Sequence, residues 1–453
     1  MFDSFNAFTE QKLAVQVFSV SAEQKDRSLV ALITSNTGSL DSTKNVISVV
    51  SAALNSVNCT TAPNCTALSR ISCVKTSGQC GVCAAGYIGD AGDRNTPCIL
   101  AREAARTTNI SVTCTVRTDC PFTWQQCDPS SGLCVAPDKS CSQSCSGHGD
   151  CIFVNRNSGL QQSTCRLDNL NCDAVCSCVN PFSGEFCEIS ANALQSRREV
   201  RSVLLGSLHN LTSEDDVSPQ SVAGWSASLY SLSIQPFELS VNDVQTVTRI
   251  ANITLQQALQ LQVDSYADMA GVLQATDTVA SLLRYNYNPN DYDATDFNIT
   301  RDYANNTAAA ILHTVSSFGE LISGSMVLGQ NATTILYNNF RMSVALNTVH
   351  AGVRNITLSN PQTESETVSN RIPSAVSLVP SVTFDSSTTV ALKIISVYPR
   401  AYAPETSDYI STPLLLQVQA QDGNITMTGD YLSSLEFSFQ NNDPQHRLVD
   451  VYE

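Results

Sequence analysis

Apolar residues recur at helical spacing through the middle of the chain. The positions that form these stripes are Val200, Val203, Leu204 and Leu208, then Val222, Trp225, Leu229 and Leu232, then Val244, Val247, Ala251, Thr254, Ala258 and Leu261, then Val272, Thr276, Val279 and Leu283, and last Ile311, Leu312, Val315 and Phe318. Ser218 before Pro219 fits a helix start, and Ser240 with Asp243 has capping-box spacing, with Asp in place of the usual Glu. The pattern predicts a helical subdomain over residues 189–345, with Trp225 in its core.

A shorter helical pattern precedes it. Its stripe comprises Val46, Val49, Val50, Ala53, Leu54 and Val57, after a start signal at Ser39 to Ser42, and an earlier stripe comprises Leu29, Leu32 and Ile33. Two short helices bury too little surface to fold alone. We therefore expect residues 1–57 to be the helical remnant of a domain that begins upstream.

The period of the pattern changes to two from about residue 336. Alternating apolar positions are Met342, Val344 and Leu346, then Val390, Leu392 and Ile394, then Leu414, Leu416, Val418 and Ala420, and, beyond the turn signal Asp422-Gly423, Ile425, Met427, Leu435, Phe437 and Phe439. Short strands joined by turns predict an antiparallel β-sandwich over residues 346–453, truncated at its end. The polar, proline-punctuated stretch from Ser359 to Pro380 predicts a long loop.

Cysteine is confined to one block. All 18 cysteines lie between Cys59 and Cys187. A count that is even, dense and local indicates disulfide-linked modules, which persist in an oxidising compartment. We divide the block into modules at residues 58–98, 99–140 and 141–188. The middle module has four cysteines, which allow three pairings, and we favour Cys114 with Cys127 and Cys120 with Cys134.

Sites for N-glycosylation agree with that compartment. Asn-x-Ser/Thr occurs at Asn58, Asn64, Asn109, Asn210, Asn252, Asn298, Asn305, Asn331, Asn355 and Asn424. Together with the cysteines, these sequons favour an extracellular or cell-surface glycoprotein. The N-terminus lacks the basic and apolar regions of a signal peptide. We therefore expect the chain to be a piece of a larger surface protein.

The last module carries the most specific motif. Its tail from Cys176 to Cys187 has the spacing C-x-C-x5-G-x2-C, and its head from Cys145 to Cys151 reads C-x2-H-G-x-C. This stretch resembles an EGF-like domain. The resemblance implies disulfides Cys141–Cys151, Cys145–Cys176 and Cys178–Cys187. An extra pair, Cys165–Cys172, departs from the six-cysteine pattern, and we interpret it as a clip on a lengthened loop.

The first module resembles the same family in part. Cys83, Gly86, Tyr87 and Gly89 match the C-x2-G-Y-x-G tail, although Cys98 lies further on than the family usually has it. We therefore interpret residues 58–98 as an EGF-like variant. Zinc is the alternative, since Cys80 and Cys83 have ligand spacing, but no second ligand pair follows. Asp138 is the only acidic residue just before Cys141, so we expect no calcium there and no cofactor elsewhere.

The C-terminal half is similar to a second family. The order of helices then strands, with the stretches Asn339 to Val344, Ile372-Pro373 and Thr412 to Leu416, looks like the GAIN domain of polycystin-like surface proteins and adhesion receptors. In such a protein residues 1–57 would fit an REJ-type remnant. The family's cysteine-bearing cleavage motif does not match His446-Arg447-Leu448, so autoproteolysis is not implied.

Charge and chemistry narrow the function. Lys and Arg number 25 against 41 Asp and Glu, a net charge of −16, which disfavours nucleic acid as a partner. The five histidines are scattered, with His313 expected to be partly buried, and no catalytic motif is present. Asp291, Asp293, Thr295 and Asp302 match a calcium-loop template, but Asp296 occupies its glycine position. Tyr285, Tyr287 and Tyr292 could contact a partner, although surface packing is the simpler interpretation.

These observations predict a non-enzymatic extracellular piece of a modular cell-surface protein that acts in adhesion or ligand recognition. Its ligand would be a protein or a glycan, and it would meet a membrane only through a segment outside this chain. The alternative is a secreted matrix or wall-associated glycoprotein without an anchor.

Overall fold

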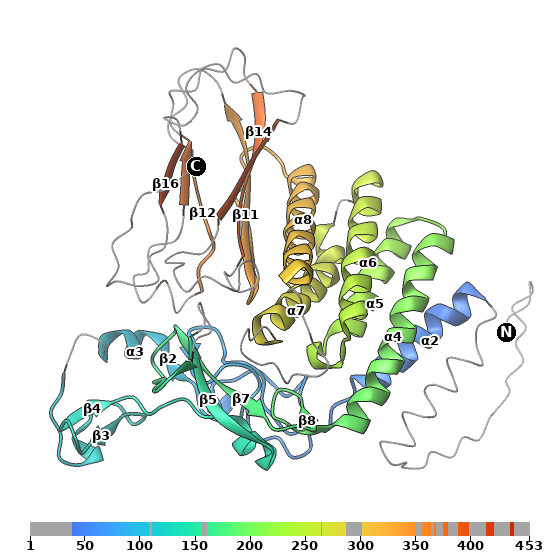
Figure 1. Ribbon diagram of the computed structural model, residues 1–453. Coiled ribbons are helices and arrows are strands. Elements are labelled where there is room, and N and C mark those ends of the chain that lie inside the picture. The colour runs from blue at the N-terminus through green and yellow to red at the C-terminus, as the bar shows by residue number, and fades with distance from the viewer. Residues whose placement is uncertain are drawn as a thin grey trace, which may run out of the picture.

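The structure is a computed structural model that describes residues 39–107, 111–155, 161–263, 265–286, 301–349, 356–363, 367, 375–378, 388–397, 414–420 and 435–438. It contains a disulfide-rich region, a helical region and small antiparallel sheets (Figure 1). The disulfide-rich region lies at one end of the helices, and the sheets lie beside α7 and α8. Among the described helices, none is both long and apolar enough to cross a membrane.

Six of the described helices make the helical region. They are α2 (Leu40–Leu54), α4 (Ala191–Glu214), α5 (Pro219–Ser233), α6 (Val241–Gln260), α7 (Ala270–Asn286) and α8 (Arg301–Ser325). The start signals at Ser39, Ser218 and Ser240 are confirmed. Ser218 Oγ accepts from the Ser221 backbone N–H at 3.1 Å, with Pro219 as the first helical residue. Ser240 and Asp243 form a reciprocal capping box, in which Asp243 Oδ2 accepts from the Ser240 N–H at 2.7 Å.

Within the described residues the apolar stripes form one core, as the periodicity predicts, except at Val203, Val49 and Val57. Val57 lies beyond the end of α2. Leu29, Leu32, Ile33 and the side chain of Leu283 lie outside the described residues. Trp225, Leu204, Leu208 and Phe318 are buried in the same cluster. Val203 is 51% exposed and Val49 is 57% exposed. An α-helix turns about 100° per residue, so the buried face of α4, centred near Arg201 and Leu205, leaves Val203 outside. Val49 lies opposite the buried Ile47 for the same reason. His313 was expected to be partly buried but is exposed on α8.

Helix α2 packs in this core, although we expected residues 1–57 to belong to an upstream domain. Ile47 and Val50 are 1% and 0% exposed, in one cluster with Leu204, Leu208 and Trp225. Lys44 Nζ is 2.8 Å from Asp215 Oδ1 at the end of α4, and Trp225 Nε1 donates to Asp215 Oδ2 at 3.2 Å. The disulfide-rich region is therefore an insertion between two helices of one core, α2 and α4. Periodicity is local and could not show this.

The sheet next to the helices has the strand order β10-β11-β14-β15. Its strands are β10 (Thr333–Leu336), β11 (Phe340–Val349), β14 (Thr388–Val397) and β15 (Leu414–Ala420). Met342 and Val344 of β11 are buried with Phe318 and Ile322 of α8. Asn339, just before β11, donates from its backbone N–H to Asp277 Oδ1 at 2.9 Å, which ties the β10–β11 turn to α7. The boundary expected at residue 345/346 falls inside β11, and the sheet shares the helical core.

A second sheet has the strand order β12-β13-β16, with β12 (Ile356–Ser359), β13 (Ala375–Leu378) and β16 (Leu435–Ser438). Ser343 Oγ of β11 donates to the Ser359 carbonyl of β12 at 2.6 Å, so the two sheets are in contact. The prediction of a long loop from Ser359 to Pro380 is wrong in part, because β13 lies within this stretch. The flanking Pro373 and Pro380 obscured a four-residue strand. Asp422-Gly423, Ile425, Met427 and Phe439 lie outside the described residues.

Candidate functional site

Every cysteine forms a disulfide, giving nine bonds in the disulfide-rich region. In the last module the bonds are Cys141–Cys151, Cys145–Cys176, Cys178–Cys187 and the clip Cys165–Cys172, as the resemblance to an EGF-like domain implies. The middle module pairs Cys114 with Cys127 and Cys120 with Cys134, the pairing that we favoured. The described pairs fit cysteine-rich, EGF-like modules.

The first module has bonds that the sequence did not specify. They are Cys59–Cys73, Cys65–Cys80 and Cys83–Cys98. First pairs with third, second with fourth and fifth with sixth, the same order as the six corresponding cysteines of the last module. Gly86 has a φ of 80°, in the left-handed region that favours glycine, at the turn into the short hairpin of β1 (Tyr87–Ile88) and β2 (Ile99–Leu100).

Two hairpins build the last module. The longer pairs β5 (Gly149–Asn155) with β7 (Cys172–Cys178), and β6 (Gln161–Gln162) extends it. The shorter pairs β8 (Phe182–Ser183) with β9 (Ile189–Ser190), closed by Gly184 at a φ of 101°. Because β9 runs to residue 190 and α4 starts at Ala191, the module passes into the helical core with no linker, and its hairpin extends two residues beyond the boundary expected at 188.

The three modules pack on one another through a small shared cluster. Its buried members are Ile88, Ile99, Ala101, Ala104, Ala136 and Leu167, and Trp124 packs against it. Ile88 and Ile99 come from the β1–β2 hairpin, and Ala101 and Ala104 come from α3 (Ala101–Thr107). Ala136 and Trp124 come from the rest of the middle module. Leu167 comes from the loop that carries the Cys165–Cys172 clip. Six small or medium side chains bury little apolar area, so the disulfides and polar contacts carry much of the stability of this unit.

Arg70 is the centre of the first module. Its side chain is 2% exposed and donates five hydrogen bonds at 2.6–3.2 Å to the carbonyls of Thr96, Gly81, Gly92 and Asp90 and to Thr96 Oγ1. Burial lowers the pKa of Arg70 to about 10, although Asp90 opposes that shift. The guanidinium stays charged at neutral pH, and it holds the loop from Asp90 to Thr96 in place within the first module.

Polar contacts then join the first module to the last. Asp90 Oδ1 accepts from the N–H of Ser140, the last residue of the middle module, at 2.9 Å, and Ser142 Oγ of the last module donates to Gln79 Oε1 at 3.1 Å. Arg94 Nη1 lies 3.5 Å from Glu185 Oε1, and Arg94 Cζ lies 4.6 Å from the ring centre of Phe186. Burial raises the pKa of Glu185. We name residues 58–187 the cysteine-rich unit, because these contacts and the shared cluster hold the modules together.

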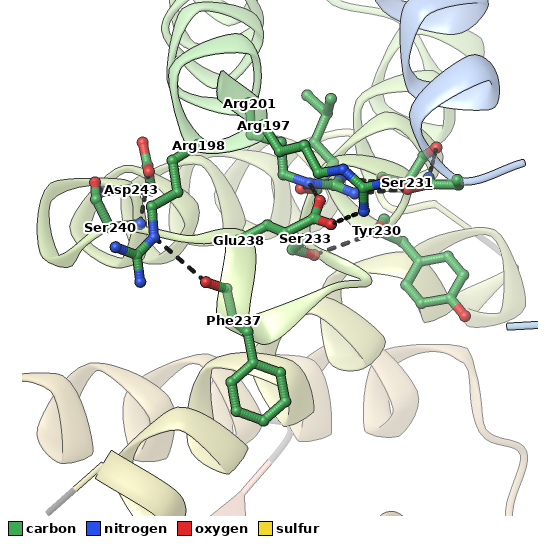
Figure 2. A network of polar contacts seen from close by, with 12 residues as sticks. Arg197, Arg198, Arg201, Tyr230, Ser231, Ser233, Phe237, Glu238, Ser240 and Asp243 are labelled. Carbon is green, nitrogen blue, oxygen red and sulfur yellow. Dashed lines mark hydrogen bonds and ion pairs between the residues drawn. The ribbon is translucent and has the colours of Figure 1, made fainter. Parts of the chain in front are cut away.

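A buried ion pair joins α4 to the turn before α6 in the helical core (Figure 2). Arg201 Nε of α4 is 2.6 Å from Glu238 Oε2, and their side chains are 0% and 3% exposed. Arg201 also donates to Asn55 Oδ1 at 2.8 Å, and Asn55 Nδ2 donates to the Ser231 carbonyl at 2.7 Å. Asn55 follows the last residue of α2, so this network fixes the point where the chain leaves the core for the cysteine-rich unit.

The cysteines offer geometry for a metal but no free thiolate. Two triads have clustered sulfurs, Cys114, Cys120 and Cys134 in the middle module and Cys141, Cys145 and Cys176 in the last. Disulfides occupy all six of these sulfurs, as they occupy the spaced pair Cys80 and Cys83. The calcium-loop residues Asp291, Asp293, Thr295 and Asp296, with Tyr287 and Tyr292, lie outside the described residues, and so do the side chains of Tyr285 and Asp302.

Sequons fall on each region. Asn58 and Asn64 are exposed on the first module, Asn210 is exposed on α4, and Asn331 is exposed between α8 and β10. Asn252 is half-buried in α6, and its Oδ1 is buried without a hydrogen-bond partner. Asn305 lies in α8, and its side chain lies outside the described part of the structure. Asn109, Asn298, Asn355 and Asn424 also lie outside the described residues.

Exposed aliphatic side chains mark the first module. Ile71 is 46%, Val74 64% and Val82 47% exposed. The Ile71 N–H donates to the Val82 carbonyl at 3.0 Å, which places these two residues on neighbouring backbone segments, and Val74 lies three residues further along the chain from Ile71. We name these three residues the aliphatic patch. Sequence reasoning missed both the patch and the Arg70 contacts, because both depend on how the disulfides fold the chain.

Comparison with known proteins does not assign a family. No protein-family model matches the chain, and no curated protein sequence matches it.

Proposed function

We propose that this chain is a non-enzymatic extracellular part of a modular cell-surface protein that recognises a ligand or mediates adhesion. The observation that carries the proposal is that all 18 cysteines are joined in disulfides within one unit. Disulfides at this density are typical of secreted and surface proteins. Membrane attachment would come from a segment outside this chain.

In this proposal the first module is an EGF-like variant, the last module is an EGF-like domain, and the sheets form a GAIN-like β-sandwich on the helices. The order of cysteine pairs in the first and last modules supports the EGF-like assignment. Contact between the two small sheets at Ser343 and Ser359 supports the sandwich. The helices followed by antiparallel strands support the GAIN-like assignment.

The aliphatic patch is the surface that we propose for recognition, and its ligand would be a protein. Three aliphatic side chains exposed on a disulfide-fixed scaffold present apolar surface at little entropic cost on binding. Such surface suits a protein partner with its own apolar side chains better than a hydroxyl-rich glycan.

Bead adhesion tests this proposal. Beads coated with the secreted chain are applied to cells of the organism that makes it, beside beads carrying Ile71→Asp with Val82→Asp. The matched control is Val116→Asp, at a residue of the middle module that is 54% exposed. We expect the patch variant to reduce adhesion to that of uncoated beads and the control to leave it unchanged. No adhesion by the native chain, or equal adhesion by the patch variant, contradicts the proposal.

A further inference from the structure

The turn between α8 and β10 holds two aliphatic side chains in water. Val327 is 71% and Leu328 50% exposed. The turn is ordered by two hydrogen bonds, from the Gln330 N–H to the Val327 carbonyl at 3.1 Å and from the Val327 N–H to Gln330 Oε1 at 3.2 Å. These side chains are therefore fixed outside the core and cannot pack into it without breaking the turn.

The strand that follows adds to this exposed surface. Within the described part of the chain, β10 is an edge strand with a neighbour, β11, on one side only. Leu336 at its end is 41% exposed. A free strand edge beside exposed aliphatic residues is a site at which chains self-associate, and proteins commonly protect such edges with charges, proline, or a covering helix or loop. The sequence from Val327 to Leu336 contains no charged residue and no proline.

Asn331 lies between the aliphatic turn and the strand. Its side chain is exposed, and Asn331-Ala332-Thr333 is a sequon. We propose that Asn331 carries an N-linked glycan that covers Val327, Leu328 and the outer edge of β10, and that this glycan keeps the chain monomeric. The inference rests on the extracellular function proposed above, because N-glycosylation takes place in the secretory route.

The modification is a balanced transfer. The Asn331 side-chain nitrogen forms a bond to the anomeric carbon of an oligosaccharide carried on a lipid diphosphate. The bond from that carbon to the diphosphate oxygen breaks, the lipid diphosphate leaves, and the amide loses one proton. No residue of this chain other than Asn331 is altered.

Asn210 provides the matched comparison. It is exposed on α4, and the 51% exposed Val203 lies seven residues before it, on the same helix face. Both sequons thus have an exposed aliphatic neighbour, but only Asn331 adjoins a strand edge. A glycan at Asn210 has no backbone edge to protect, since the helix satisfies its own hydrogen bonds.

Secretion of the full chain with four sequon variants tests the proposal. Asn331→Gln and Thr333→Ala remove the sequon, Thr333→Ser retains it, and Asn210→Gln removes the comparison site. Glycan mapping gives the occupancy of each sequon, and size-exclusion chromatography with light scattering gives the molar mass. We expect Asn331→Gln and Thr333→Ala to lose one glycan and to form dimers or larger species. The native chain, Thr333→Ser and Asn210→Gln should remain monomeric.

Adding Val327→Ser and Leu328→Ser to Asn331→Gln should restore the monomer. That result would show that the association comes from uncovered aliphatic side chains and not from misfolding. The proposal is overturned if other sequons carry glycans and Asn331 does not, if both sequon-removing variants stay monomeric at the concentrations tested, or if the serine substitutions leave the association unchanged. Absence of glycans from every sequon would overturn the extracellular proposal as well, so the two failures are distinguishable.

Discussion

The cysteine-rich unit and the helical core are stabilised by opposite means. The unit has nine disulfides around a cluster of six small or medium apolar residues, and a buried arginine organises its loops. The helical core has no cysteine, and large side chains such as Trp225, Leu204 and Phe318 fill it. Cross-links lower the entropy of the unfolded chain, whereas the core gains from burial of apolar area.

The difference explains how one region can be inserted in the other. A unit closed by its own disulfides does not need the core for its stability, and both its ends emerge at the core. The core in turn loses little when a long insertion separates α2 from α4, because loop-closure entropy rises only slowly with length. The Asn55, Arg201 and Glu238 contacts fix the junction between the two.

The largest effect should come from the ion pair at that junction. Glu238→Ala leaves Arg201 buried without its carboxylate, and breaking a buried pair costs about 3–5 kcal/mol. We expect that loss in the free energy of unfolding of the helical core, measured by urea denaturation followed through the far-ultraviolet circular dichroism of its helices. Arg197→Ala is the matched control, since the Arg197 side chain is 35% exposed and also contacts Glu238, and it should cost about 1 kcal/mol or less. Equal losses in the two variants would contradict the account.

The next largest effect is the difference in stability between a substitution on the buried face of α2 and one on its exposed face. Ile47→Ala removes a side chain that is 1% exposed in the helical core, and such a change costs about 2–5 kcal/mol. Val49→Ala, at the 57% exposed position two residues later, should change the stability by about 0.5 kcal/mol or less. The same urea transition of the core measures both. If Ile47→Ala left that transition in place, α2 would not belong to the core.

The smallest effect is a change in the pKa of one carboxyl group of the cysteine-rich unit. Hydrogen bonds from Ser131 and Ser130 lower the pKa of Asp128 to about 2. A lowered carboxyl pKa contributes stability above the unfolded pKa of about 3.9, and that contribution is lost as the pH falls through the folded pKa. Ser131→Ala should raise the pKa of Asp128 towards its ordinary value, measured by an NMR titration of the carboxyl carbon. Asp119, held by Thr115 and Val116, is the internal control and should titrate as before.

Local signals in the sequence predicted much of this architecture. The caps at Ser218 and Ser240, the buried faces of the helices and the strands around Met342 and Val390 follow from short-range spacing. The pairs of the last module follow from the EGF-like motif. Membership of α2 in the core could not be predicted, because it depends on contacts across the whole cysteine-rich block.

The candidate site was less accessible to prediction. Arg70, Arg94 and Glu185 are single charged residues with no spacing signal. The folded disulfides bring Arg94 to Glu185, and they bring the first-module carbonyls to Arg70. The aliphatic patch is hidden in the same way, since Ile71 and Val82 become neighbours only across a backbone hydrogen bond. The short strand β13 was obscured by the prolines on both sides of it.

Hydrogen exchange after disulfide reduction tests the central claim, that the cysteine-rich unit is an insertion in one helical core. The native chain is reduced, the thiols are alkylated, and exchange is followed by mass spectrometry over residues 40–54, 58–187 and 191–260. We predict that 58–187 loses its protection while 40–54 and 191–260 keep theirs and exchange together. Loss of protection at 40–54 along with the cysteine-rich unit, while 191–260 stays protected, would contradict the account.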